Sequence, residues 1–182
     1  MKTTDLAIHY VCTHDQAEEI IAGHHAFWVS NCGCRENHGG CARPRLDVCL
    51  IFTLSDPGSG TGKRPITRLE VTGILQEARD KQLVARPYRD ESRTATDGIC
   101  FCCDDCCGYF LDPTERCDKG KLIAETSFEI CSHCGICVEA CYFNARKMLE
   151  DKLVVEDDQC YGCGLCLPTC PEGCIEMVTR MG

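Results

Sequence analysis

Long apolar runs are missing from this sequence. No stretch of its 182 residues approaches the roughly 20 apolar residues of a membrane-spanning helix, so we expect no membrane span. Residues 1–12 contain no apolar core of signal-peptide length, and we therefore expect the protein in the cytoplasm.

Positive charge is also scarce. Nineteen Lys and Arg stand against 28 Asp and Glu, which gives a net charge of −9 at pH 7. Proteins that bind nucleic acid normally have a basic patch, so we expect no nucleic-acid partner. An acidic protein of this kind would be attracted to redox partner proteins with basic docking faces. The glycine-rich segment 56–65 (D-P-G-S-G-T-G-K-R-P) lacks the spacing of the Walker phosphate loop, so we also expect no bound nucleotide.

Cysteine, in contrast, is abundant, and its spacing is typical of metal ligands. Twenty cysteines in a short secreted chain would suggest a disulfide scaffold. Residues 131–141 (C-S-H-C-G-I-C-V-E-A-C) and 160–171 (C-Y-G-C-G-L-C-L-P-T-C-P) instead each have C-x2-C-x2-C-x3-C spacing. In this pattern three cysteines surround one 4Fe–4S cube and the fourth binds the other cube. Two structural zinc sites are the alternative, but they would leave the third and fourth cysteines of each run unused.

The two runs closely resemble those of bacterial-type ferredoxins with two 4Fe–4S clusters, and the resemblance covers roughly residues 120–180. It implies one cluster on Cys131, Cys134, Cys137 and Cys170, and a second cluster on Cys160, Cys163, Cys166 and Cys141. Tyr142 departs from the family pattern, because proline usually follows the fourth cysteine, as Pro171 does in the second run. Cys174 matches Ala145 of the first repeat, so we expect it to serve packing.

A second concentration of cysteines lies in the first 118 residues. The segments 32–41 (C-G-C-R-E-N-H-G-G-C) and 98–110 (G-I-C-F-C-C-D-D-C-C-G-Y-F) predict a further metal site. Its candidate ligands are Cys32, Cys34, Cys41, Cys100, Cys102, Cys103, Cys106 and Cys107. A third 4Fe–4S cluster is the first hypothesis, with structural zinc or a larger, non-cubane cluster as alternatives. Cys49 is interpreted as a buried small hydrophobe, and Arg35 either offsets cluster charge or forms a surface salt bridge.

This order of motifs resembles a little-characterised group of cysteine-rich 4Fe–4S binding proteins. The resemblance supports an architecture more than an activity. We expect an α+β fold, with a small α/β cysteine-rich domain at 1–118 and a ferredoxin-type two-cluster module at 119–182.

Local patterns predict the elements of both domains. In the first we expect a strand at 4–12 and then a helix, capped by Thr13 or Asp15, that runs to about Ala26 and carries His24 and His25. A core strand should follow at 48–54. Thr67 and Glu70 fit a capping box that opens a helix to about Leu83 with Leu69 on its apolar face, and a turn-rich excursion should follow at 84–98. In the second we expect strands at 121–126 and 174–178 and a hairpin at 145–155.

The cysteine spacing leads to three functional hypotheses. The first hypothesis is an electron carrier between oxidoreductases, because a cube held by four thiolates has no open coordination position for a substrate. We expect such a carrier in an anaerobic or low-oxygen cell. A subunit of a redox enzyme with a catalytic N-terminal cluster is the second, although the sequence shows no conventional catalytic residues. A redox or metal sensor is the third. His133, inside the first cluster loop, is either a group whose protonation tunes the cluster potential or an exposed loop residue.

Overall fold

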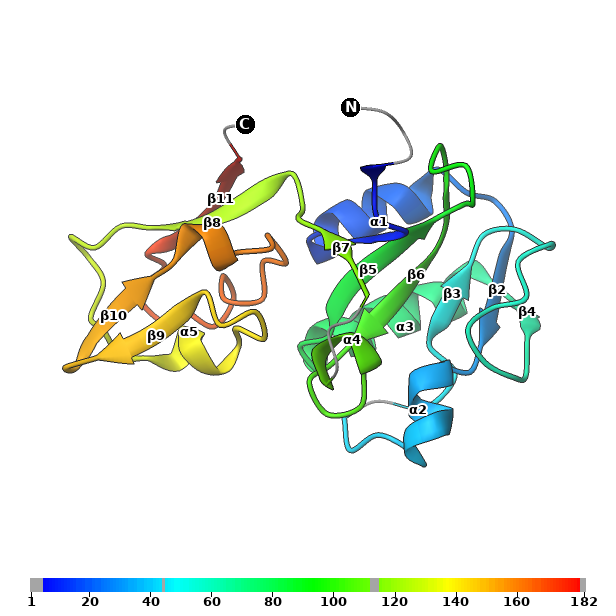
Figure 1. The fold of residues 1–182 in the computed structure, drawn as a ribbon, viewed down its shortest axis with the longest axis horizontal. Helices are drawn as coiled ribbons and strands as arrows, with labels where there is room; N and C mark the ends of the chain where they lie inside the picture. The colour runs from blue at the N-terminus through cyan, green and yellow to red at the C-terminus, as the bar shows by residue number, and fades with distance from the viewer. Residues whose placement is uncertain (1–4, 44, 112–114, 181–182) are drawn as a thin grey trace.

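The computed structural model describes residues 5–43, 45–111 and 115–180, and these form two parts that lie side by side (Figure 1). The N-terminal part is built on a seven-stranded sheet with the order β4-β2-β3-β6-β5-β1-β7. Its strands are β1 (His9–Tyr10), β2 (Phe27–Ser30), β3 (Cys49–Ile51), β4 (Arg64–Ile66), β5 (Val84–Arg89), β6 (Thr96–Cys102) and β7 (Cys117–Asp118). All neighbouring strands pair antiparallel except β1 and β7.

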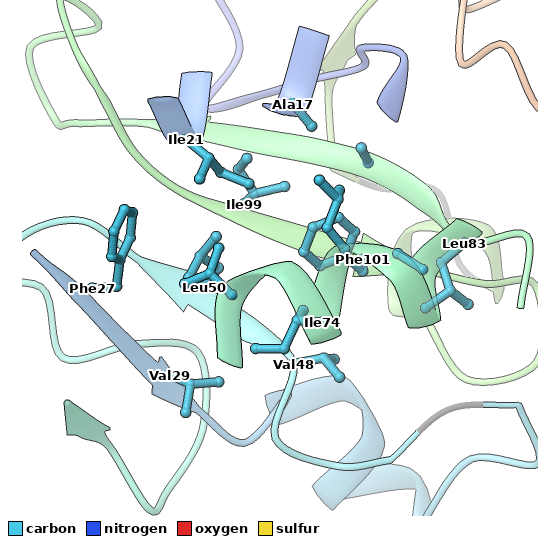
Figure 2. Packing of buried hydrophobic residues seen from close by; sticks show 14 of the residues in the cluster. Ala17, Ile21, Phe27, Val29, Val48, Leu50, Ile74, Leu83, Ile99 and Phe101 are labelled. Carbon is cyan, nitrogen blue, oxygen red and sulfur yellow. The ribbon is translucent and has the colours of Figure 1, made fainter. Parts of the chain in front are cut away.

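Two helices cover one face of this sheet. They are α1 (His14–Ala22) and α3 (Arg68–Asp80), and their buried residues share one apolar core with alternate residues of the central strands (Figure 2). Burying this face removes apolar area from water, which is the main force that holds the two layers together. Cys49, Cys100 and Cys102 alternate along β3 and β6 with residues of this core and so lie on the opposite face. Cys103 and Cys106, in contrast, belong to the core itself.

Both helices begin with a capping box. The Thr67 side chain caps α3 with Glu70, as the sequence predicts. Of the two candidate caps of α1, Thr13 and Asp15, Thr13 is the N-cap, and it forms a capping box with Gln16 that the sequence analysis did not predict. Helix α1 ends at Ala22, four residues earlier than expected, so His24 and His25 lie beyond it. Leu69 is 82% exposed, and the expectation that it faces the core is wrong.

The largest error in the expected fold concerns residues 84–98. Residues 84–89 form β5 and residues 96–98 begin β6, the most extensive strand pair of the sheet, so only the turn at 90–95 between them agrees with the expected excursion. The Arg89 N–H donates to the Ile8 carbonyl, and the Ala85 carbonyl accepts from Cys12, so both residues direct backbone groups toward the β1 side of the sheet. Pro87 lies midway between them and has the same orientation. Because its nitrogen does not face β6, the lack of an N–H removes no hydrogen bond between β5 and β6. The strand expected at 4–12 is also shorter, because β1 is only His9–Tyr10; residue 4 lies outside the described residues.

The C-terminal part consists of two small antiparallel pairs. Strand β8 (Leu122–Thr126) pairs with β11 (Ile175–Thr179), and β9 (Arg146–Leu149) with β10 (Lys152–Val155). Both agree with the sequence prediction, including the tight turn at Glu150 and Asp151, which have φ of 48° and 60°. Short helical segments α2 (Gly33–His38), α4 (Gly108–Leu111), α5 (Ile136–Glu139) and η2 (Asp157–Gln159) complete the chain. No helix among the described residues is long and apolar enough to cross a membrane.

The two parts share a small apolar core. Val11 and Val84 of the N-terminal part are buried together with Ala140 and Leu165 of the C-terminal part. Aromatic side chains surround this cluster, and they are Phe110, Tyr142, Phe143 and Tyr161. The junction is therefore a packed interface.

Candidate metal centres

Two cavities in the C-terminal part bring the ferredoxin-type cysteines together. Cys131, Cys134, Cys137 and Cys170 line the first cavity, and Cys141, Cys160, Cys163 and Cys166 line the second. Each set is the one implied by the sequence resemblance, with the fourth cysteine coming from the other run. No three of these sulfurs lie within 4.8 Å of one another among the described residues, which leaves room for a cube between them. The donor set and the spacing fit a 4Fe–4S cluster at each cavity.

The cluster loops depend on left-handed backbone positions. Gly162, in the second run, has φ of 78°, and a Cβ on it would lie 2.1 Å from the carbonyl oxygen of Leu122. In the first run His133 has φ of 55°, and its Nδ1 accepts the backbone N–H of Leu153 at 3.0 Å. His133 therefore fixes the loop against β10.

Cys170 is the thiol with the most backbone support. Burial raises its pKa, but N–H groups of Cys174, Glu172 and Gly173 outweigh burial and lower it overall. The Cys174 sulfur lies 3.3 Å from the Cys170 sulfur and lines the first cavity. Cys174 is buried, and its role as a packing residue stays a prediction.

Arg146 is a functional residue that the sequence analysis missed. Its guanidinium is buried, lines the second cavity, and donates to the Cys137 sulfur of the first cavity at 3.7 Å and to Thr126 Oγ1 at 3.0 Å. Burial opposes its charge, yet the thiols of Cys166, Cys137 and Cys141 outweigh burial and raise its pKa. The signal was present in the internal repeat, where Arg146 matches the buried apolar residue Ile175.

The N-terminal cysteines surround a third cavity, of about 390 Å³, on the sheet face away from α1 and α3. The thiols that contact one another around it belong to Cys32, Cys34, Cys102 and Cys107. Cys100 also lines this cavity, and its thiol hydrogen-bonds that of Cys49. Cys49 is buried as expected, but this contact places its sulfur beside the metal-site cysteines.

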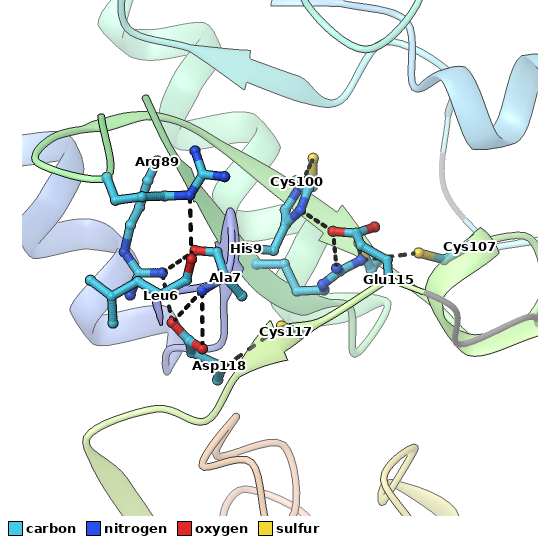
Figure 3. A network of polar contacts seen from close by, with 12 residues as sticks. Leu6, Ala7, His9, Arg89, Cys100, Cys107, Glu115, Cys117 and Asp118 are labelled. Carbon is cyan, nitrogen blue, oxygen red and sulfur yellow. Dashed lines mark hydrogen bonds and ion pairs between the residues drawn. The ribbon is translucent and has the colours of Figure 1, made fainter. Parts of the chain in front are cut away.

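Two buried arginines, Arg35 and Arg86, line this cavity. Arg86 donates to the sulfurs of Cys102 at 3.7 Å and Cys107 at 3.6 Å, and it pairs with Glu115 at 3.2 Å. Figure 3 shows Glu115 in this region, near Cys107 and His9. Hydrogen bonding from Cys107 and the charge of Arg86 lower the pKa of Cys102 to about 6, although burial opposes them. Glu115 also pairs with His9, which lies at the same wall of the cavity. Hydrogen bonding also lowers the pKa of Cys34, whereas hydrogen bonding and burial raise the pKa values of Cys32 and Cys107, so two of the four thiols are stabilised as thiolates, the form that binds metal.

A separate group of three thiols belongs to Cys41, Cys103 and Cys106. Their sulfurs lie within 4.8 Å of one another, with 3.5 Å between Cys41 and Cys103 and 3.5 Å between Cys103 and Cys106. Arg35 is 1% exposed and donates to the carbonyls of Phe101 and Arg45. The alternative prediction that Arg35 forms a surface salt bridge is therefore wrong. The structure thus divides the eight predicted N-terminal ligands between two places.

Comparison with known proteins identifies the C-terminal part. Residues 130–174 match the family model of the 4Fe-4S dicluster domain. The chain is 42% identical over 69 residues to a tetrathionate reductase subunit of Archaeoglobus fulgidus. This alignment covers 36% of this chain and 33% of that protein. It is 32% identical over 84 residues to an uncharacterized ferredoxin of Methanocaldococcus jannaschii, and this alignment covers 42% of this chain and 51% of that protein.

The C-terminal part is therefore a 4Fe–4S ferredoxin domain of the dicluster type. The chain spans about a third and about half of the length of these two curated relatives.

Proposed function

We propose that this protein carries low-potential electrons between oxidoreductases through two C-terminal clusters and a third cluster in the N-terminal cavity. The observation that carries the proposal is the pair of four-cysteine cavities within the matched dicluster domain. A cube held by four thiolates supplies one-electron chemistry without an open position for substrate.

The proposal assigns ligands to each cluster. The first takes Cys131, Cys134, Cys137 and Cys170, the second takes Cys141, Cys160, Cys163 and Cys166, and the third takes Cys32, Cys34, Cys102 and Cys107, with Cys100 beside them. The domains divide at 118/119, and the end of β7 at Asp118 and the start of β8 at Leu122 support this boundary.

Three aromatic rings span the junction between the third cavity and the second. Tyr109 lines the N-terminal cavity, and Phe143 and Tyr161 line the second cluster cavity. The ring centroids of Tyr109 and Phe143 are 6.5 Å apart, and those of Phe143 and Tyr161 are stacked at 4.4 Å. These contacts support electron exchange between the N-terminal site and the ferredoxin domain.

Charge supports a role in docking to other redox proteins. Residues 127–182 carry nine Asp and Glu against four Lys and Arg, and bound thiolate clusters add negative charge. The redox partners would then present basic docking faces, and salt would slow the encounter. All 20 cysteines are free thiols, which is compatible with a reducing compartment such as the cytoplasm.

A redox titration of protein prepared without oxygen tests the proposal. We expect about twelve irons and twelve sulfides per chain, and three one-electron signals in electron paramagnetic resonance. About eight irons would remove the third cluster and leave a two-cluster carrier. Fewer irons, or clusters that do not reduce reversibly, would refute electron transfer by this route.

A subunit of a redox enzyme is the second candidate. Arg86, Glu115 and His9 place polar groups at the wall of the N-terminal cavity, which a simple carrier does not require. Similarity to a protein named as part of a tetrathionate reductase also favours this candidate. Co-purification of the chain with a larger catalytic subunit from its native cell would support it over the free carrier.

A further inference from the structure

We propose that Cys41, Cys103 and Cys106 bind a single tetrahedral metal ion of the zinc class, at a site separate from the N-terminal cluster. The site goes beyond the proposed function, because it holds an ion that carries no electrons.

Sulfur spacing distinguishes one ion from a cube. Thiolates that share one tetrahedral zinc at about 2.3 Å lie about 3.8 Å apart, whereas thiolates on different irons of a cube lie further apart. The two measured separations in this group are each 3.5 Å, and all three sulfurs fall within 4.8 Å. Among the described residues this is the only group of three possible ligands so close together. The eight ferredoxin-type cysteines provide an internal contrast, since no three of their sulfurs lie within 4.8 Å of one another among the described residues.

The paired cysteines explain how two sites fit into one short segment. Cys103 and Cys106 contact Cys41, whereas their chain neighbours Cys102 and Cys107 contact each other and Arg86. Within the described ranges no sulfur–sulfur hydrogen bond joins the two groups. All four residues border the same cavity, but Cys103 and Cys106 also pack in the core shared with α1 and α3, which Cys102 and Cys107 do not join.

The surroundings complete the ion site. Three thiolates and a divalent cation leave one negative charge, and the buried Arg35 guanidinium beside Cys106 and Cys41 offsets it. The carboxylate of Asp105 accepts the backbone N–H of Ala42 at 2.9 Å and also contacts the Cys41 thiol. No carboxylate oxygen among the described residues lies within 4.8 Å of all three sulfurs, so a water molecule would supply the fourth ligand.

The ion would fasten the loop after α2 to the turn after β6. Cys41 is 62 residues from Cys103 in sequence, and a shared ion closes that long loop. Closing a long loop stabilises the folded state by restricting the unfolded chain. The bound ion would thereby also hold the neighbouring cluster ligands Cys102 and Cys107 in position, even in protein whose N-terminal cluster has not been assembled.

Metal content of four full-length proteins tests the inference. Wild type, Cys41→Ser, Cys34→Ser and Cys117→Ser are prepared without oxygen from cells supplied with zinc and iron. We expect about one zinc per chain in the wild type, loss of that zinc in Cys41→Ser with iron unchanged, and retained zinc with about four fewer irons in Cys34→Ser. Cys117, which lines none of the metal cavities, is the matched control and should keep both metals.

Two results would overturn the ion site. One is iron loss in Cys41→Ser, which would place all these thiols on one cluster; the other is wild-type protein without zinc. Zinc X-ray absorption of the unmodified protein avoids any folding defect of a variant, and it should show three sulfurs at about 2.3 Å and one lighter atom. A zinc without sulfur neighbours would also refute the site. If the wild type contains zinc but only about eight irons, the third cluster fails and the ion site stands.

Discussion

Replacing Arg146 with isoleucine should make both ferredoxin clusters harder to reduce. Arg146 places a buried positive charge 3.7 Å from the Cys137 sulfur and beside the second cavity. Reduction adds one negative charge to a cluster, and this guanidinium stabilises that charge. Isoleucine is the matched replacement, because Ile175 occupies the same position of the second repeat and is also buried.

The size of the effect follows from Coulomb's law. With about 6 Å between the guanidinium and a cluster centre and an effective dielectric constant of about 20, the attraction is about 3 kcal/mol. For a one-electron couple this corresponds to about 120 mV, and relaxation of the surrounding groups reduces it. We therefore expect potentials lower by about 50–120 mV in Arg146→Ile, with the larger shift at the first cluster.

Protein-film voltammetry without oxygen measures the shift directly. Arg146→Lys keeps the charge and should restore most of the potential. Lys147→Met removes an exposed charge one residue away, which pairs with Glu156, and should change the potentials by less than about 20 mV because water and salt screen it. Equal shifts in Arg146→Ile and Lys147→Met, or a positive shift in Arg146→Ile, would refute the reasoning.

Two further predictions concern the clusters and the fold. Cys134→Ala and Cys163→Ala should each lose about four irons per chain by metal analysis, and iron loss in the control Cys117→Ala would count against the assignment. Thr67→Ala removes the N-cap of α3 and should cost about 1 kcal/mol, so amide hydrogen exchange in the first turn should become about fivefold faster. Thr72→Ala, which loses a hydrogen bond to a carbonyl of the same helix, should leave those amides within about twofold of the wild type.

Short-range patterns were the reliable part of the sequence prediction. The capping box of Thr67 and Glu70 depends on residues three apart, and the structure confirms it. Thr13 is the N-cap of α1, which is one of the two candidates that the sequence offered. The ferredoxin-type spacing likewise encodes its own geometry, so each predicted set of four cysteines lines one cavity.

Long-range packing decided what the sequence left open. Pro87 suggested a break in the chain, and only its place opposite the short strand β1 makes it acceptable in β5. The sequence analysis treated the N-terminal cysteines as one set of ligands. No local pattern indicates that Cys41 contacts Cys103 rather than its neighbour Cys102. Arg146 was missed for a similar reason, since its partners Ala124 and Thr126 belong to β8, about 20 residues earlier.

The shared apolar core at the junction would determine the kinetics of the proposed electron exchange between the N-terminal site and the ferredoxin domain. Val11, Val84, Ala140 and Leu165 fix the two parts against each other, so no docking step precedes that exchange. Transfer between the parts should therefore be first order, with a rate that depends neither on protein concentration nor on ionic strength. Transfer to a separate partner is second order and slows as salt screens the charges. A rapid-mixing experiment at several salt concentrations would separate the two rates.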